Sequence, residues 1–327
     1  MLILSEKEIQ KNYLMKDAIN DLKQGLISKN AGKIYNPHRT VIDVPAYQAS
    51  ALYMPGADFS KEMAAVKVVS IFPENPEQGM PTTQGVLMLT DARTGEHLCM
   101  MNASYLTRLR TGALSGVATE KLSRKGSTTL GVIGTGAMSF EQVLGVLEVR
   151  DIDTIKLFNR TYEKANVFKE KLIEFGVQQH IEVMDHVDHV VQSSDIISCA
   201  TRSNEPVLNG KVMRDGTHVN GVGSYLPSMR EIDLYTIQRA SKIVVDDLIG
   251  AKEEAGELID ADENHNWSFS DVYAELSDLA VGEHLRREND EEVTIFKSVG
   301  AAYFDLVLAQ GIYFKLNQLG VGTNIEV

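Results

Sequence analysis

The sequence predicts an α/β protein in which a doubly wound Rossmann sheet is joined to a discontinuous α+β domain. Two observations support this fold class. A strand-like apolar run at 129–133 leads directly into Gly134-Thr135-Gly136 and then into a helical pattern. From there on strand and helix patterns alternate, whereas earlier strand patterns follow one another without helices between them. Alternation of this kind is typical of a parallel sheet that is covered by helices on both faces.

The elements before residue 123 indicate a mixed or antiparallel sheet. A helical spacing of apolar residues extends over 6–29. Strands are predicted next, the last two of them forming a hairpin, and a helix closes this part of the chain; the ranges are 51–55, 64–72, 84–90 and 98–103 for the strands and 106–122 for the helix.

The second part of the chain carries the alternating pattern. Strands are predicted at 129–133, 154–158, 181–184, 195–200, 217–220 and 242–246, and helices at 138–148, 161–175, 187–192, 229–235 and 250–260. Since six strands already fill a Rossmann sheet, the helix that ends at Leu316 is expected to return to the first domain. The predicted domains are therefore 1–122 with 300–327, and 123–299.

Composition narrows the functional classes. The chain has 327 residues, of which 43% are hydrophobic and 24% charged, and its formal net charge is −13. Such an acidic balance argues against nucleic acid and anionic membranes as partners. No apolar run approaches the ~18 residues of a membrane span. Cys99 and Cys199 both lie in apolar runs, which favours reduced core thiols in a cytoplasmic protein.

The glycine turn predicts a dinucleotide site, in preference to an ordinary α/β turn. Glycines allow a tight turn and a close approach of the backbone to a pyrophosphate. The following helix offers free N–H groups and the positive end of its dipole to that phosphate. The candidate cofactor-binding residues here are Gly134, Thr135, Gly136, Ala137 and Met138.

The end of the next strand bears on the choice of cofactor. Asn159 lies 23 residues after Gly136, close to the spacing expected for the residue that contacts the ribose. An acidic residue there would repel a 2′-phosphate, whereas Asn159 followed by Arg160 and Thr161 would accept one. The sequence therefore favours NADP(H), with NAD(H) as the alternative. Two later strand ends are candidates for the nicotinamide pocket, at Ala200-Thr201 and Val222-Gly223.

Basic side chains in the first domain are candidates for substrate binding. Arg110, followed by Thr111 and Gly112, can offer a bidentate fork to a carboxylate or form a structural salt bridge. Lys67 lies between valines, and taken alone this pattern favours a lysine that alternates outward on a half-buried strand. Asp185 to His189 holds two histidines and two aspartates, but nothing completes a ligand set, so no metal site is predicted.

These features together resemble the ornithine cyclodeaminase/mu-crystallin family. The matching segments occur in the family's order over nearly the whole chain: Arg39, Met54-Pro55, Lys67, Leu109 to Ala113, Gly131 to Gly136, Phe158 to Thr161, Ala200-Thr201, Asn220 to Gly223, Pro227 to Glu231 and Phe296 to Gly300.

The resemblance implies a homodimer with a substrate and dimerisation domain built from both chain ends. It implies that Arg39 and Arg110 hold a substrate carboxylate, with Lys67 beside the carbon that accepts hydride and Thr83 near the substrate. It also adds Thr111, Ser298 and Gly300 to the residues expected at the cofactor.

One departure from the family helps to choose a reaction. The cyclodeaminases carry an aspartate two residues before a proline, where this chain has Tyr225 before Pro227. Tyrosine, with an ordinary pKa near ~10, is a poor base at neutral pH. A preformed imine needs no such base. The hypothesis is an NAD(P)H-dependent reductase of a cyclic α-imino acid, with Tyr225 in the substrate pocket.

The alternatives from the sequence are an ornithine cyclodeaminase and an alanine dehydrogenase. A nucleotide-binding protein without enzymatic activity, as among the crystallins, is a further reading. The presence of Arg39, Lys67 and Arg110 together argues for an enzyme, since a protein that only binds a nucleotide need not carry all three.

Overall fold

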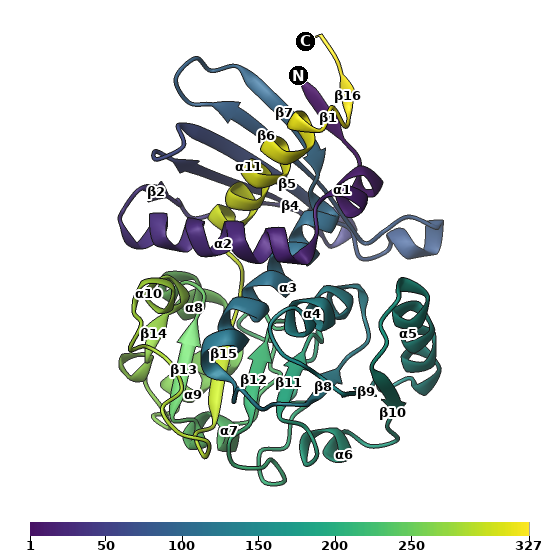
Figure 1. Ribbon diagram of the computed structural model, residues 1–327, viewed down its shortest axis with the longest axis vertical. Coiled ribbons are helices and arrows are strands. Elements are labelled where there is room, and N and C mark those ends of the chain that lie inside the picture. Colours follow the sequence, from purple (N-terminus) through teal and green to yellow (C-terminus); the bar gives the residue numbers. More distant parts are fainter. Residues whose placement is uncertain (327) are drawn as a thin grey trace. The chain divides into compact units, whose positions relative to one another are not determined.

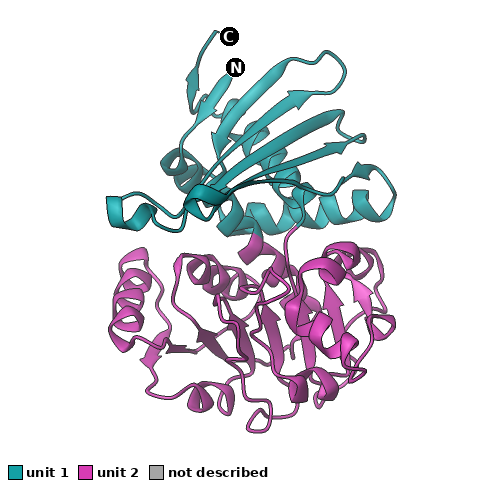
Figure 2. Ribbon diagram, turned by 180° about the vertical axis from the view of Figure 1, so that it is seen from behind, with its two compact units in different colours: residues 1–110, 301–327 teal, residues 111–300 magenta. Residues whose placement is uncertain are grey.

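The structure is a computed structural model that describes residues 1–326. The chain forms two compact units, residues 1–110 with 301–327 (unit 1) and residues 111–300 (unit 2), which Figure 2 colours separately. The first boundary falls inside helix α3 (Ala103–Leu122), whereas the sequence analysis put it at the end of that helix. Among residues 1–326, no helix is both long and apolar enough to cross a membrane.

Unit 1 is built around one eight-stranded sheet. Its strand order is β16-β1-β7-β6-β5-β4-β2, with β3 also paired to β4, and every pairing except β1 with β7 is antiparallel. The strands are β1 (Leu2–Leu4), β2 (Ile34–Tyr35), β3 (Thr40–Val44), β4 (Ala49–Asp58), β5 (Met63–Ile71), β6 (Thr83–Asp91), β7 (His97–Asn102) and β16 (Thr323–Asn324). The predicted hairpin is confirmed as β6 and β7.

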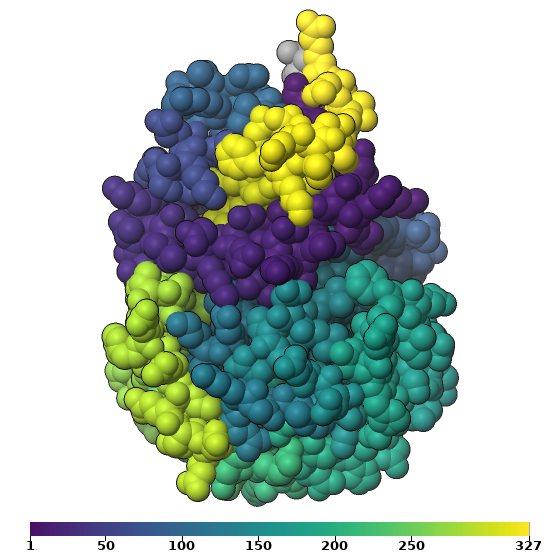
Figure 3. All heavy atoms as spheres, in the orientation of Figure 1, coloured from purple at the N-terminus to yellow at the C-terminus, as the bar shows by residue number. Residues whose placement is uncertain are grey.

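Both chain ends contribute to this unit. Helix α11 (Ala302–Gln318) packs on β4, β5 and helix α2 (Met15–Asn30), so one face of the sheet is covered by helices (Figure 1). In the space-filling view, the yellow C-terminal helix lies against the purple N-terminal segment (Figure 3). The expected return of the last helix to the first domain is therefore observed.

The predicted helix over 6–29 is in fact two helices, α1 (Glu6–Asn12) and α2. The chain turns at Tyr13, which has an extended backbone with φ −130° and ψ 106°. This conformation buries the Tyr13 ring, and the hydroxyl donates to Asp21 Oδ2 at 2.5 Å. Tertiary packing of one aromatic residue thus interrupts a continuous helical pattern.

Unit 2 is a parallel sheet of eight strands in the order β10-β9-β8-β11-β12-β15-β13-β14. Alternate residues of its strands supply two apolar clusters; for example, Val132 belongs to one and Ile133 to the other, because successive side chains point to opposite faces. The strands are β8 (Thr129–Ile133), β9 (Thr154–Phe158), β10 (His180–Val183), β11 (Ile196–Cys199), β12 (His218–Gly221), β13 (Lys242–Val245), β14 (Ala274–Glu275) and β15 (Thr294–Lys297).

The helices of unit 2 join successive strands. They are α4 (Ala137–Leu147), α5 (Tyr162–Phe175), α6 (Val187–Val191), α7 (Leu234–Arg239), α8 (Leu248–Glu254), α9 (Gly256–Glu263) and α10 (Leu276–Val281). The doubly wound fold is confirmed, and the six predicted strands all occur.

Two details of the prediction for unit 2 are wrong. The sequence analysis assigned six strands, but β15 lies between β12 and β13 in the sheet. The helix expected at 229–235 begins only after Asp233, whose side chain accepts from Thr236 N. The preceding residue Glu231 is held outside any helix because its carboxylate bonds backbone N–H groups of two other loops.

Candidate active site

Lys67 lies in the middle of β5 and points into unit 1. Its neighbours in register are Met54 on β4 and Leu87 on β6, and its side chain is only 3% exposed. The reading of Lys67 as an outward-facing residue of a half-buried strand is therefore wrong. Its Nζ lies 2.6 Å from Asp305 Oδ2 and 3.4 Å from Thr107 Oγ1. An ammonium has three N–H donors, so one has no acceptor among residues 1–326.

Asp305 is shared between Lys67 and Arg110. It lies in the first turn of α11 and is 1% exposed. Its second oxygen, Oδ1, is 3.7 Å from Arg110 Nε, and neither atom has a hydrogen-bond partner in the described part of the chain. The sequence analysis missed Asp305. The signal was a single acidic residue within an apolar helical run, Ala301 to Ala309.

Arg39 and Thr83 reach the same region by strand register. Arg39 directly precedes β3, whose first residue pairs with Tyr53, so Arg39 is placed next to Met54 and on the face of Lys67. Thr83 is the first residue of β6, an even number of positions from Leu87, and shares that face as well. The Lys67 cluster is defined here as Lys67, Asp305, Arg110 and Arg39.

The electrostatics of the cluster follow from burial. Burial disfavours the ammonium form and is the main cause that lowers the pKa of Lys67 from its ordinary value to about 8. The positive charges of Arg110 and Arg39 lower it further, whereas the carboxylate of Asp305 raises it. A lysine with a pKa near 8 can give or take a proton in the neutral to mildly alkaline range.

The Lys67 cluster contains three cations and one carboxylate. Such a set suits an anionic ligand, and a guanidinium gives a planar, two-pronged match to a carboxylate. The spare N–H of Lys67 can in addition donate to a polar atom beside that carboxylate. Unit 1 thus has the groups for binding a small carboxylic acid and for moving one proton.

The glycine turn of unit 2 has the geometry of a close backbone approach. Gly134 follows β8 with φ +87°, a conformation that side chains rarely adopt. A Cβ there would lie 2.7 Å from Thr201 Cγ2 and 3.1 Å from Ala200 O. Gly136 caps the N-terminus of α4, and a Cβ placed on it would meet no atom within 4 Å. The turn is tight on the side of the protein and open on the other side, as a pyrophosphate site requires.

Asn159 braces this turn from the end of β9. Its Oδ1 accepts from Thr135 N at 3.3 Å, and its Nδ2 donates to Thr161 O at 2.9 Å. The adjacent Arg160 is exposed. The predicted spacing therefore brings a neutral amide, instead of a carboxylate, to the position beside the turn.

Two further loops lie at the carboxyl ends of neighbouring parallel strands. Ala200-Thr201 follows β11, and Val222-Gly223 follows β12. Glu231 joins them, because Oε1 accepts from Thr201 N at 2.5 Å and Oε2 accepts from Gly223 N at 2.6 Å. Burial raises the pKa of Glu231, and the nearby Lys297 opposes that rise.

Lys297 on β15 completes a second buried group of charges. Its Nζ donates to Ser224 O at 2.6 Å and Ser224 Oγ at 2.5 Å, and lies 3.1 Å from Glu257 Oε1. Ser224 Oγ in turn bonds both oxygens of Glu257 at 2.9 Å. The Lys297 cluster is defined here as Lys297, Glu257, Ser224 and Glu231. The sequence analysis gave none of these residues a role.

The remaining predicted residues lie in unit 2. Ser298 and Gly300 follow β15, and Asp246 Oδ2 accepts from Ser298 Oγ at 2.6 Å and from Gly300 N at 2.8 Å. Thr111 is buried in α3. Tyr225 is partly buried next to Ser224.

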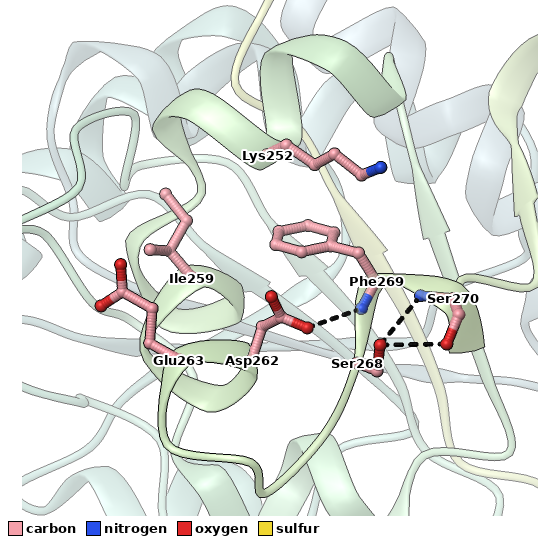
Figure 4. A pocket seen from close by; sticks show the side chains of 7 residues that line it. All are labelled: Lys252, Ile259, Asp262, Glu263, Ser268, Phe269 and Ser270. Atoms are coloured by element: carbon pink, nitrogen blue, oxygen red, sulfur yellow. Dashed lines mark hydrogen bonds between the residues drawn. The ribbon is translucent and has the colours of Figure 1, made fainter.

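A separate hollow lies elsewhere in unit 2, between α8, α9 and a turn at Phe269–Asp271 (Figure 4). Lys252, Asp262 and Phe269 are among the side chains that line it, and Asp262 Oδ1 accepts from Phe269 N at 3.2 Å. None of the predicted site residues lines this hollow.

The family model of the ornithine cyclodeaminase/mu-crystallin family matches residues 1–319. The chain belongs to this family. A Delta(1)-pyrroline-2-carboxylate reductase of Bacillus cereus, a relative, is 38% identical over 327 residues, which are 100% of both chains.

Solved structures of the family agree with the fold described above. The Delta(1)-pyrroline-2-carboxylate reductase of Thermococcus litoralis, solved in complex with NADH and L-proline, is 36% identical with a TM-score of 0.94, over 99% of this chain and 100% of that one. An archaeal alanine dehydrogenase dimer with bound NAD is 31% identical with a TM-score of 0.91, over 100% of this chain and 99% of that one.

Proposed function

We propose that this chain is an NAD(P)H-dependent reductase of a cyclic α-imino acid. The substrate is Δ1-pyrroline-2-carboxylate or its six-membered homologue, and the product is L-proline or L-pipecolate. The observation that carries the proposal is the buried Lys67 ammonium, which has one N–H to spare beside two arginines. The similarity to two pyrroline-2-carboxylate reductases along the whole chain supports it.

Arg110 and Arg39 bind the α-carboxylate of the imino acid in this proposal. The substrate can arrive as an imine with one negative charge or as an iminium with no net charge. A site with three cations and one carboxylate disfavours the iminium form, since nearby positive charge lowers the pKa of a basic nitrogen. The imine nitrogen then has to receive its proton from the protein.

Lys67 supplies that proton. When bound, the nicotinamide cofactor provides a hydride for the C=N carbon. As the new C–H bond forms, the π-electron pair of C=N moves to nitrogen, and nitrogen takes a proton from the Lys67 ammonium. The product is a secondary amine, and the neutral Lys67 regains a proton from water. General acid catalysis of this kind contributes roughly 10²- to 10⁴-fold to a rate.

The residues of unit 2 suit a nicotinamide dinucleotide. Gly134 and Gly136 keep the turn open, the N–H groups at the start of α4 receive the pyrophosphate, and Ala200-Thr201 and Val222-Gly223 contact the nicotinamide end. Thr111, Ala137, Met138, Ser298 and Gly300 complete the proposed set.

We further propose that NADPH is preferred over NADH. Asn159 brings no negative charge to the ribose position, and the exposed Arg160 with Thr161 can pair with a 2′-phosphate. A higher kcat/KM with NADPH than with NADH at equal imino acid concentration is expected. An equal or lower value would make NADH the preferred cofactor and leave the proposed reaction unchanged.

Two alternative reactions remain as tests. The similarity to an alanine dehydrogenase favours pyruvate and ammonia as a second candidate substrate pair. The cyclodeaminase reaction is disfavoured, because Tyr225 stands where those enzymes resemble one another in having an aspartate.

A substrate panel distinguishes these reactions. Purified protein is mixed with NADPH or NADH and either Δ1-pyrroline-2-carboxylate, Δ1-piperideine-2-carboxylate, or pyruvate with ammonia, and loss of absorbance at ~340 nm is followed. We expect turnover of the cyclic imino acids and Thr83 and Tyr225 variants that change KM between the two rings. Turnover of pyruvate alone, or ammonia release from L-ornithine with catalytic NAD, would reject the proposal.

We also propose that the protein is a homodimer joined through the sheet of unit 1. The view from behind shows the face of this sheet that α2 and α11 do not cover (Figure 2). Tyr53, Val68 and Val86 lie side by side on it, and Val86 is 47% exposed. Light scattering should give twice the chain mass of 36.1 kDa, and Val86→Asp should give the monomer.

A further inference from the structure

Asp305 holds the Lys67 cluster together although it is the least obvious member in the sequence. Its carboxylate lies between two cations and presents a different oxygen to each, Oδ2 to Lys67 at 2.6 Å and Oδ1 to Arg110 at 3.7 Å. All three side chains are less than a tenth exposed. The buried carboxylate therefore compensates positive charge that water cannot reach.

The position of Asp305 is fixed by the helix that carries it. Residues on both sides of Asp305 in α11, from Ala302 to Gln310, are buried. The backbone N–H of Tyr303, two residues earlier, donates to Asn36 Oδ1 at 3.2 Å. A carboxylate on a helix packed in this way has little freedom to follow the lysine, so the lysine has to come to it.

Asp305 bonds Lys67 firmly and Arg110 only loosely. Oδ1 and Arg110 Nε face each other beyond hydrogen-bond distance, and neither has another partner among residues 1–326. This asymmetry fixes the Lys67 ammonium and leaves the Arg110 guanidinium able to close on a ligand.

We propose that Asp305 is the positioning residue of this site, which holds Lys67 Nζ so that its remaining N–H points to the imine nitrogen, without itself touching the substrate. This inference rests on the proposed function in one respect only, the identity of the proton acceptor. The hold of Asp305 on Lys67 can be measured without any substrate.

The consequence for pH follows from the groups that face Lys67. These are Asp305 on α11, Thr107 and Arg110 on α3, and Arg39 before β3. Of the charged groups, Asp305 alone raises the pKa of Lys67, whereas the two arginines lower it. Without Asp305 the lysine should lose its proton well below pH 8, and the reductase should lose its proton donor with it.

Asp305→Asn tests this inference in the full-length protein. The alkaline limb of the pH profile of kcat/KM for imino acid reduction should move to lower pH by about one unit or more. At pH 8 and above each unit removes about nine-tenths of the protonated lysine, so kcat should fall about tenfold or more. KM for the dinucleotide should stay within about twofold, since its proposed ligands lie in unit 2. An unchanged pH profile with unchanged kcat would overturn the proposal.

Asp17→Asn is the matched control. Asp17 Oδ2 also lies 2.6 Å from a lysine on α11, Lys315, but both side chains are about a third exposed. This variant removes the same charge from the same unit and should leave kcat and the pH profile unchanged. Asp305→Glu keeps the charge but displaces it by one methylene group. It should keep the alkaline limb in place while lowering kcat, which a purely structural role of Asp305 would not predict.

A titration of Lys67 by NMR separates this inference from the proposed function. Protein labelled with ¹³C at lysine Cε is titrated without ligands, and the Lys67 signal is assigned by its absence in Lys67→Met. A lower midpoint in Asp305→Asn supports the positioning role even if no cyclic imino acid is reduced. An unchanged midpoint rejects the positioning role even if the wild-type protein proves to be the proposed reductase.

Discussion

Units 1 and 2 each bury a small cluster around a lysine, and the two clusters differ in how completely their hydrogen bonds are made. Lys297 in unit 2 places its ammonium on three oxygens, and both carboxylates of its cluster are bonded at each oxygen. Lys67 in unit 1 has two partners, and Asp305 Oδ1 and Arg110 Nε have none within the described residues.

The difference separates a scaffold from a site. A buried charge network in which each member is satisfied has nothing left to offer a ligand, but it can fix the loops that it joins. A buried cluster with unmade hydrogen bonds costs stability and persists where a ligand completes it. By this reasoning the Lys297 cluster positions the loops after β11 and β12, and the Lys67 cluster binds and transforms the substrate.

The largest expected effect is that of Lys67→Met on turnover. Removal of the proton donor should lower kcat about a thousandfold, while NADPH still binds with nearly unchanged affinity in a fluorescence titration. Lys315→Met, which removes an exposed lysine from the same unit, should leave kcat unchanged. If wild-type protein binds NADPH but turns over none of the substrates in the panel, the non-enzymatic reading gains instead.

Lys297→Met should affect stability instead of chemistry. It leaves Glu257 buried without its cation, which should lower the free energy of unfolding by about 3–5 kcal/mol in a urea titration. Residual folded protein at low temperature should retain a kcat close to that of the wild type. A stable but inactive Lys297→Met protein would break the distinction between the two clusters.

The pH dependence should distinguish the clusters by a smaller effect. Reduction requires the protonated form of Lys67, so its kcat/KM should fall about tenfold per pH unit as pH rises through about 8. Oxidation of L-proline requires the neutral form and should rise through the same pH. Parallel pH profiles in the two directions would show that Lys67 is not the proton donor.

Much of the fold could be predicted because its signals are local. The glycine turn after 129–133 and the alternation of strands and helices depend on residues close together in the chain. The errors arose where distant contacts overrode a local pattern. Tyr13 breaks a helical run to reach Asp21, and β15 enters the middle of a sheet that already had six strands.

The sequence by itself determined the Rossmann fold, the dinucleotide turn and the membership of Arg39, Lys67 and Arg110 in one basic set, because residue types at fixed spacings carry these properties. Only the tertiary structure decided that Lys67 is buried and that Asp305 holds it. Asp305 follows Lys67 by 238 positions, and their contact depends on a C-terminal helix packing on a strand from the N-terminal part of the chain. A lysine's pKa depends on neighbours in space, and no local pattern specifies them.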